Sequence, residues 1–238
     1  MSCASRRPGG GFGGAELTGA QIEGEGAGGG VAVYDIVRVV RDEYPLPDGY
    51  PYARGTTWLY ELRYRSTGKN FCGAGAQGER VAIALAGYYD ETNTAHPDPK
   101  RVTFACTRGV MAKCYRWGYR PWLGREMADA HQACIRMAMA DYCGDGRSWT
   151  RDATLIQRWD LLSPPVQPKN ELRASMSFEA AWTPLGAACL ARPRWQGLVE
   201  DFRPERCARK IPVCPSEQEA LREPGAILLN ASGHNVLK

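Results

Sequence analysis

Four side chains with catalytic potential lie close together in the sequence, between residues 124 and 150. His131 supplies a base, Cys134 a nucleophile, and Asp141 and Asp145 two carboxylates, which are the groups that hydrolases use for nucleophilic or acid–base catalysis. His131 and Cys134 are three residues apart, so a helix places them on the same face. This spacing allows a hydrolase in which His131 or Asp141 works with Asp145 as acid or base.

A structural role accounts for the same residues without catalysis. Catalytic cysteines gain a low pKa at the N-terminus of a helix, whereas Cys134 falls in the middle of the predicted helix. Asp141 can instead accept backbone N–H groups from the turn that follows it, provided that an arginine balances its charge: Arg136, Arg147 or Arg151. We therefore expect that none of these residues is catalytic, and the hydrolase is the alternative.

The sequence predicts no metal or cofactor site. Asp141, Asp145 and Asp152 surround a glycine turn, but the EF-hand spacing of calcium loops is absent. The nine cysteines form no CxxC pair, and the three histidines do not supply zinc-finger spacing. Two GxGxxG matches occur within residues 1–30, but neither follows a predicted strand, as a dinucleotide-binding turn requires.

Hydrophobic periodicity predicts an α+β fold. Alternating apolar residues indicate antiparallel strands at 31–40, 58–64, 81–85, 102–106 and 153–159. A period near 3.6 predicts helices at 110–117 and 125–142, the longer one capped by Gly144 in the left-handed conformation. Short helical turns are expected at 178–182, 184–190 and 216–222. The expected architecture is an antiparallel sheet packed on a central helix.

Composition divides the chain into three parts. Residues 1–30 are rich in glycine and poor in core-forming side chains, so we expect a flexible tether. Two five-residue repeats within it, at 15–19 and 20–24, resemble turns of a pentapeptide solenoid, and we expect them to lie as an edge segment on the main domain. Residues 31–215 are expected to form a single domain, and residues 216–238 a C-terminal tail.

Cysteine is the compositional outlier, with nine residues in 238. Reduced cytosolic chains rarely carry so many spread-out cysteines, so we interpret most of them as disulfides formed in an oxidising compartment. Cys134 and Cys143 lie on opposite sides of the predicted helix, about 13 Å apart, which is too far for a bridge between them. Cys114 can pair with Cys134 across neighbouring helices, and Cys207 can pair with Cys214 to close a small loop. The disulfide candidates are Cys72, Cys106, Cys114, Cys134, Cys143, Cys189, Cys207 and Cys214.

The N-terminal residues bear on where the protein works. An exported protein needs an apolar signal segment, and MSCASRRPGGG contains none. If translation starts further upstream, Ser2-Cys3 and the glycine-rich tract would match the end of a lipoprotein signal, and Cys3 is then the lipid-anchor candidate. The alternative is an ordinary cytosolic start.

Charge and hydropathy limit the classes of partner that the protein is expected to bind. Thirty basic and 26 acidic residues leave a net charge of +4, and the two signs are interspersed, which argues against a nucleic-acid binder. The longest apolar run is far shorter than the ~18 residues of a transmembrane segment. Four aromatic residues lie around the long helix, and core packing is their expected role: Trp117, Tyr119, Trp122 and Trp149. The alternative is that they form a glycan or peptide surface together with Arg116, Arg120 and Arg125.

Ala140-Asp141-Tyr142-Cys143, followed by Gly-Asp-Gly, resembles the signature of the ADYC domain, a bacterial family named for that tetrapeptide. Three further blocks resemble its companion motifs: FACTRGV from Phe104, KCYRWGYRPW from Lys113 and QACIRM from Gln132. The resemblance covers roughly residues 31–214. It implies a secreted or envelope protein, often with a lipoprotein-type leader, and it implies no activity. We therefore expect a non-enzymatic envelope or secreted module that binds a protein or glycan.

Overall fold

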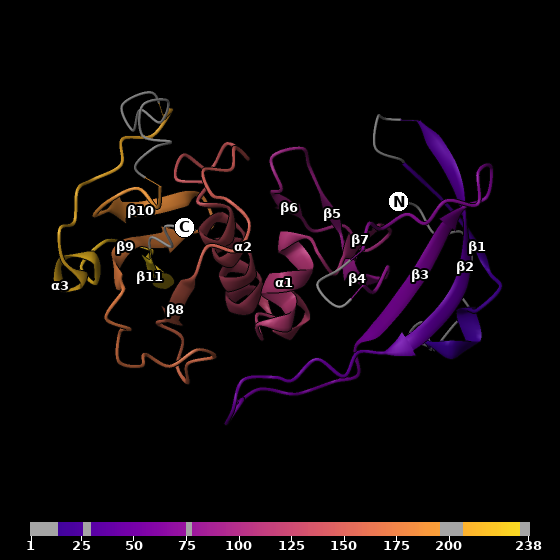
Figure 1. The fold of residues 1–238 in the computed structure, drawn as a ribbon, viewed down its shortest axis with the longest axis horizontal. Coiled ribbons are helices and arrows are strands. Elements are labelled where there is room, and N and C mark those ends of the chain that lie inside the picture. The colour runs from indigo at the N-terminus through magenta and orange to yellow at the C-terminus, as the bar shows by residue number, and fades with distance from the viewer. Residues whose placement is uncertain (1–13, 26–29, 75–77, 196–206, 234–238) are drawn as a thin grey trace. The chain divides into compact units, whose positions relative to one another are not determined.

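The computed structural model describes residues 14–25, 30–74, 78–195 and 207–233 of the chain (Figure 1). The chain divides into two compact units. The first unit is Met1–Pro45, Arg54–Asp90 and Ala95–Arg116, and the second is Leu46–Ala53, Glu91–Thr94 and Trp117–Lys238. Each unit has its own sheet and buried core, whereas the sequence predicted one domain around one core.

The first unit contains a five-stranded antiparallel sheet in the order β1-β2-β3-β4-β7. The strands are β1 (Gln21–Glu25), β2 (Val31–Arg41), β3 (Trp58–Tyr64), β4 (Ala82–Ala86) and β7 (Val102–Cys106). The strands predicted within residues 31–106 are therefore present. Also in this unit are the short helices η1 (Ala15–Leu17) and α1 (Val110–Arg116) and the hairpin of β5 (Tyr88–Tyr89) and β6 (Ala95–His96).

Alternation along β3 gives the first sheet two buried faces, because successive side chains point to opposite sides. Leu59 packs with Ile83 and with Tyr115 of α1 on one face. Its neighbour Tyr60 packs with Ile36 on the other. The first unit therefore buries apolar side chains above and below its sheet.

Residues 14–25 belong to the first sheet unit and correct the predicted boundary of the tether at residue 30. Leu17, Ala20 and Ile22 pack against the cluster around Tyr60, and β1 forms the edge of the sheet beside β2. The five-residue repeats therefore lie as an edge segment, as predicted, because their few apolar side chains find a partner surface. Cys3 and the rest of residues 1–13 lie outside the described residues.

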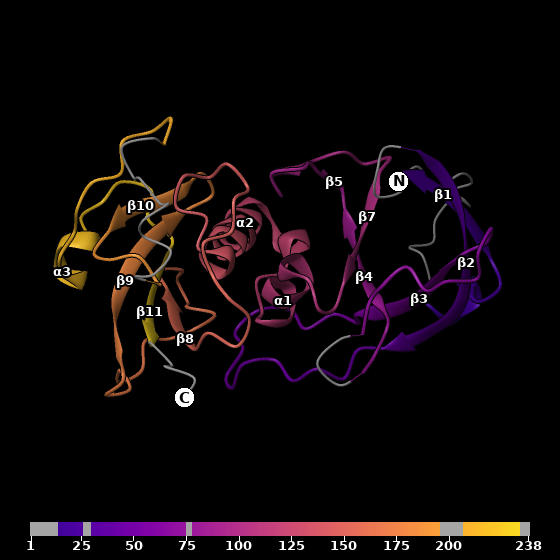
Figure 2. The ribbon, with the colours of Figure 1, turned by 45° about the horizontal axis from the view of Figure 1, so that its top comes forward.

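The second unit contains a four-stranded antiparallel sheet in the order β10-β9-β11-β8. Its strands are β8 (Ile156–Asp160), β9 (Met176–Thr183), β10 (Gly186–Leu190) and β11 (Leu228–Gly233). The helix α2 (Arg125–Met139) contacts β9, β10 and β11, and Figure 2 shows it beside this sheet. Two short helices, η2 (Pro121–Leu123) and α3 (Glu217–Ala220), complete the unit.

Three predictions for the C-terminal part are wrong. The helical turns expected at 178–182 and 184–190 are the strands β9 and β10, which form a hairpin. Both strands are buried on both faces over most of their length, so the period of two that marks a half-buried strand is missing from their sequence. The segment 216–238 is not a tail, because β11 lies inside the sheet and is buried throughout. The short helix predicted near residue 216 is present as α3, with Ser216 as its N-cap.

Disulfide bonds cross-link segments within both units. Cys72–Cys106 joins two segments of the first unit, while Cys143–Cys207 and Cys189–Cys214 lie in the second. The predicted Cys207–Cys214 pair is wrong, because the chain at Val213 pairs in parallel with Leu190 and brings Cys214 beside β10. Cys114 and Cys134 are each disulfide-bonded as well. All eight candidate cysteines between residues 72 and 214 are therefore oxidised.

Candidate functional site

The C-terminal end of α2 is closed by a Schellman motif. Ala140 takes the left-handed conformation (φ 54°), and its N–H donates to the carbonyl oxygen of Met137. The N–H of Asp141 donates to the carbonyl oxygen of Arg136 at 2.8 Å. The helix thus ends before Gly144, the cap that the sequence predicted, because Ala140 already provides the left-handed turn.

The last four carbonyl groups of α2 all have partners. Those of Arg136 and Met137 accept the two N–H groups of the Schellman motif. Arg194 donates from Nη2 to the oxygen of Met137 at 2.6 Å and from Nη1 to that of Ala138 at 3.1 Å. The oxygen of Met139 accepts the N–H of Trp149 and the hydroxyl of Ser148. A buried helix end without such partners would be costly, so these contacts are part of the fold.

Asp141 organises the turn that follows the helix. Its Oδ1 accepts the N–H groups of Gly144 and Asp145, and its Oδ2 accepts the N–H of Gly146 at 2.9 Å. Arg136 Nη1 lies 2.7 Å from the same Oδ2, and both side chains are almost fully buried. Four donors occupy the lone-pair positions of the carboxylate, in the arrangement that the sequence predicted for a structural aspartate.

The guanidinium of Arg136 also donates hydrogen bonds to other parts of the second unit. Its Nε donates to the carbonyl oxygen of Pro184, in the turn between β9 and β10. Nη1 donates to the carbonyl oxygen of Thr92, and Nη2 to the hydroxyl of Thr94 at 2.6 Å. Burial raises the pKa of Asp141, while Arg136 and the N–H of Gly146 act to lower it.

A second buried network surrounds Tyr142. Its hydroxyl donates to Glu179 Oε1 at 3.1 Å, and its ring stacks on Trp182 with 5.3 Å between centroids. Arg194 forms a bidentate pair with Glu179, with both N–O distances 3.0 Å and both side chains fully buried. Asn230 of β11 donates to Glu179 and accepts the indole N–H of Trp182. Burial, and after it the charge of Glu179, raises the pKa of Tyr142 well above its usual value.

The tetrapeptide 140–143 and the glycines after it thus have identifiable structural roles. Ala140 ends the helix, Asp141 holds the turn, Tyr142 joins the Glu179 network, and Cys143 is bonded to Cys207. Gly144 and Gly146 have positive φ and approach neighbouring backbone so closely that a Cβ atom would clash, with Leu185 and Thr92 respectively. This signature is a helix terminus whose side chains are engaged in structural contacts.

The remaining candidates from the hydrolase alternative lie in different settings. His131 is fully buried in α2, and Cys134, one turn further along, is fully buried and disulfide-bonded. Asp145 is exposed, and its carboxylate accepts the N–H of Arg147. A disulfide-bonded cysteine supplies no thiolate nucleophile. Within the described part of the chain, no group of three or more His, Cys, Asp or Glu side chains could hold a metal ion.

The aromatic residues around α2 differ in burial, and Tyr119 takes the core position that was expected by default. Tyr119 is fully buried, and its hydroxyl donates to Asp160. Arg120 is also buried, while Trp122 is half exposed. The Asp160 carboxylate further accepts the N–H groups of Leu162, Val166 and Gln167, and burial raises its pKa. Tyr119 therefore helps to position the loop after β8 through Asp160.

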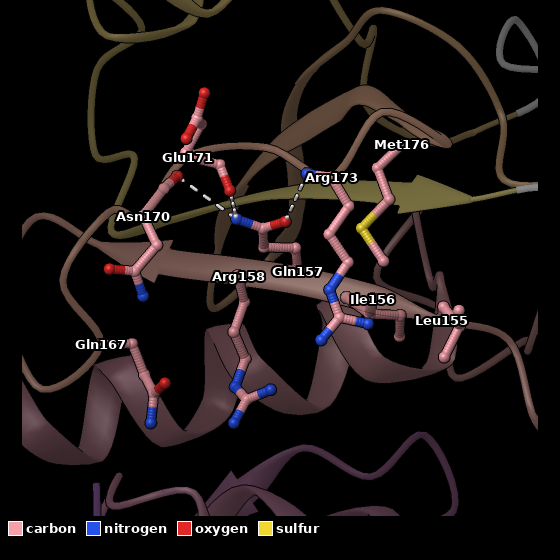
Figure 3. Close-up of a pocket in the computed structure, with 9 residues that line it drawn as sticks. All are labelled: Leu155, Ile156, Gln157, Arg158, Gln167, Asn170, Glu171, Arg173 and Met176. Carbon is pink, nitrogen blue, oxygen red and sulfur yellow. Dashed lines mark hydrogen bonds between the residues drawn. The ribbon is translucent and has the colours of Figure 1, made fainter. Parts of the chain in front are cut away.

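A pocket of about 410 Å³ lies beside β8 in the second unit (Figure 3). Residues 155–158 form one wall and the segment 167–176 the other. Arg158, Gln167 and Arg173 extend to the same side of β8 in Figure 3, whereas the carboxylate of Glu171 points away from them. These residues were not predicted from the sequence, because no motif marks them and only the fold brings the loop beside the strand.

A second cavity of about 460 Å³ lies at the start of α2. It is lined by Arg125, Glu126, Asp129, Leu161, Leu162, Ala226 and Ile227. Its arginine is already 3.9 Å from the carboxylate of Asp129, one helical turn away. Glu126 adds a second carboxylate, so the lining of this cavity is net negative, whereas two arginines and one glutamate line the β8 pocket. The β8 pocket is therefore the better site for an anionic ligand.

An Asp–His pair in the first unit was likewise not predicted from the sequence. His96 Nε2 lies 2.7 Å from Asp90 Oδ2, and the two side chains are 40% and 26% exposed. The imidazole stacks on Tyr88 at 4.6 Å, and the guanidinium of Arg101 lies 4.0 Å from the centroid of the Tyr88 ring. His96 and Tyr88 face each other across the β5–β6 hairpin, so the cluster holds that hairpin together.

The tetrapeptide and the elements around it fall within a region that matches a known family. The family model of the ADYC domain matches residues 14–196, which include the first sheet, α2 and the tetrapeptide. No curated protein and no solved structure matches the chain. No helix in the described ranges has the length and apolar character needed to cross a membrane. By the extent of the family match, the chain belongs to the ADYC domain family.

Proposed function

We propose that this chain is a non-enzymatic, disulfide-stapled binding module of the bacterial cell envelope or of secreted proteins. The observation that carries the proposal is the use of the signature residues. Asp141 and Tyr142 are engaged in buried structural contacts and Cys143 in a disulfide, while the open β8 pocket lies elsewhere and presents arginine side chains. A rigid scaffold with a separate polar pocket fits recognition of a ligand better than turnover.

The oxidised cysteines support an extracytoplasmic location. All eight cysteines from 72 to 214 are disulfide-bonded, and such bridges persist in oxidising compartments and are rare in the bacterial cytosol. Anchoring through a lipid on Cys3 is the accompanying proposal for the envelope form, and that residue lies outside the described ranges. The binding partner would be an envelope protein or glycan.

The hydrolase alternative has weaker support. Both oxygens of Asp141 already accept hydrogen bonds from the backbone and from Arg136, and His131 is fully buried. A general acid or base must reach a proton of its substrate, and these two groups lack that access. Asp145 alone is exposed.

Cell fractionation combined with mass spectrometry tests the proposal. We expect the natural protein in the envelope or secreted fraction, with non-reducing peptide maps recovering the Cys72–Cys106, Cys143–Cys207 and Cys189–Cys214 bridges. An intact mass that includes a lipid would confirm the anchor on Cys3. Recovery of the protein in the cytosol with free thiols would overturn the location. Hydrolysis of an envelope substrate that is lost in Asp145→Asn would overturn the non-enzymatic part.

A further inference from the structure

We propose that the β8 pocket binds a carboxylate-bearing saccharide. This inference rests on the proposed binding function and names its ligand class. The pocket has a volume of about 410 Å³, within the range of roughly 300–1,000 Å³ that is typical of small-molecule sites. It therefore suits the end of an acidic glycan or a short acidic oligosaccharide.

The pocket is held open by contacts within its own walls. The amide nitrogen of Gln157 donates to the carbonyl oxygens of Asn170 and Glu171, at 3.3 and 2.8 Å. Its amide oxygen accepts the N–H of Arg173 at 3.2 Å. One side chain of β8 thus fixes the backbone of the opposite wall (Figure 3), so the pocket exists before a ligand arrives.

Two guanidinium groups give the pocket its charge preference. Arg158 lies 3.7 Å from the centroid of the Trp117 ring, and this stacking fixes the direction of its guanidinium. Arg173 is exposed and, within the described residues, makes no side-chain hydrogen bond or ion pair. Both extend to the same side, away from the Glu171 carboxylate (Figure 3). Arginine forks match the planar geometry of a carboxylate.

The other lining residues favour a sugar as the carrier of that carboxylate. Asn170 brings an amide group suited to hydroxyl groups, and so does the amide oxygen of Gln167, whose nitrogen donates to the carbonyl oxygen of Trp117 at 2.7 Å. Leu155, Ile156 and Met176 provide apolar surface for a ring face. An extended peptide would instead need a free strand edge. At the end of β8 the strand edge is already hydrogen-bonded within the chain, because the N–H of Asp160 donates to the carbonyl oxygen of Gln167.

Isothermal titration with the oxidised full chain tests the inference. The probes are a uronic-acid trisaccharide, a sialylated trisaccharide, the neutral hexose trisaccharide and a hexaglutamate peptide. We expect one or both acidic saccharides to bind, and to bind at least about tenfold more tightly than the neutral one, because a charged hydrogen-bond pair is worth ~1.5–3 kcal/mol. The two acidic probes separate uronate from sialate sources.

Three substitutions test whether the acidic saccharide binds in the β8 pocket. Arg173→Gln should weaken binding of the acidic saccharide at least about tenfold, and Arg158→Gln likewise. Arg125→Gln removes the same charge from a side chain that is 95% exposed and outside the pocket, and it should leave the affinity unchanged. Because the exposed side chain of Arg173 makes no hydrogen bond or ion pair within the described residues, its variant should fold normally even if Arg158→Gln does not.

Several results would overturn the inference. These are equal affinity for the neutral trisaccharide, tighter binding of the peptide, no binding of either acidic probe, or equal loss of affinity in Arg125→Gln and Arg173→Gln. The proposed function would survive each of these, provided that the protein is oxidised in the envelope or secreted fraction and binds another ligand. It fails separately if the protein is cytosolic and reduced.

Discussion

Arg136 and Asp141 form an ion pair across the end of α2, with Nη1 and Oδ2 2.7 Å apart and both side chains almost fully buried. The pair connects the last turn of the helix to the loop after it, since Asp141 also accepts three backbone N–H groups. Arg136 in turn reaches the β9–β10 turn through the carbonyl oxygen of Pro184. A single charge pair therefore joins helix, loop and hairpin.

Removing the negative charge of that pair should strongly destabilise the second unit. In Asp141→Asn the buried guanidinium of Arg136 loses its counter-charge, so we expect the free energy of unfolding to fall by about 3–5 kcal/mol. Urea unfolding of the oxidised protein measures this change. The matched control is Asp145→Asn, where the side chain is exposed and the effect should stay within about 0.5 kcal/mol. Equal effects of the two substitutions would contradict the structural role of Asp141.

Glu179→Gln provides a parallel prediction for the second network. The substitution leaves Arg194 buried without a carboxylate, and we expect a loss of about 3–5 kcal/mol in the free energy of unfolding. Glu217→Gln serves as the comparison, because its partner Lys169 is half exposed and such pairs contribute less than about 1 kcal/mol. If chemical denaturation ranks the two variants in the opposite order, the Glu179 network does not hold the second unit together.

The raised pKa of Asp160 predicts a pH-dependent contribution to stability. Burial makes the folded protein hold this proton more tightly than the unfolded chain, whose pKa is near 3.8. The stabilisation from this group is complete below pH 3.8 and is lost as the pH rises through the raised folded value. The difference in unfolding free energy between the wild type and Asp160→Asn should therefore decrease as the pH rises from below 3.8 through the raised folded pKa. A difference that grows toward neutral pH would show that the N–H donors outweigh burial.

Loop length predicts which of two disulfides in the second unit contributes more. Cys143 and Cys207 are 64 residues apart, and replacing both by Ser should cost about 4 kcal/mol through the entropy of the unfolded chain. Cys189 and Cys214 are 25 residues apart, and the corresponding loss should be about 3.5 kcal/mol. Thermal or urea unfolding of the two double variants gives the order. The reverse order would mean that native contacts, rather than chain entropy, dominate.

Substitutions of Ala140 test how the left-handed conformation at the end of α2 affects stability. A non-glycine residue in this conformation costs roughly 1–2 kcal/mol, while burial of its methyl group returns about 0.8 kcal/mol. These effects nearly cancel in Ala140→Gly, so we expect a change in unfolding free energy of less than about 1 kcal/mol. Ala140→Val adds a β-branched side chain at positive φ and should be clearly destabilising. Similar losses in both variants would show that the methyl group matters more than the backbone conformation.

The sequence predicted those elements whose apolar residues recur with a clear period, and it failed where that period is missing. Residues 60–64 of β3 alternate aromatic or aliphatic with charged side chains, and the apolar residues of α2 recur with a helical period, so both were found close to their observed bounds. β9 and β10 are buried over most of their length and both contact α2, and their alanine-rich sequence resembles a helix. β9 lies inside the sheet, whereas β10 is its edge strand. The partners of Asp141 could be predicted because they are local in the chain. The β8 pocket could not, because it depends on a loop that folds back on a strand.

Because β11 lies between β9 and β8, the second sheet can form only after β11 has been synthesised. β8 ends at Asp160 and pairs with a strand that begins at Leu228, roughly 70 residues later. At the usual ~5–20 residues per second, the ribosome needs about 3–14 s to make that stretch, and β8 and β9 are unpaired on those edges meanwhile. The first sheet can close during synthesis, whereas the second must wait. If the chain is exported as proposed, and export begins before Leu228 has been made, the second sheet is still open at the export channel and its disulfides can form on the far side.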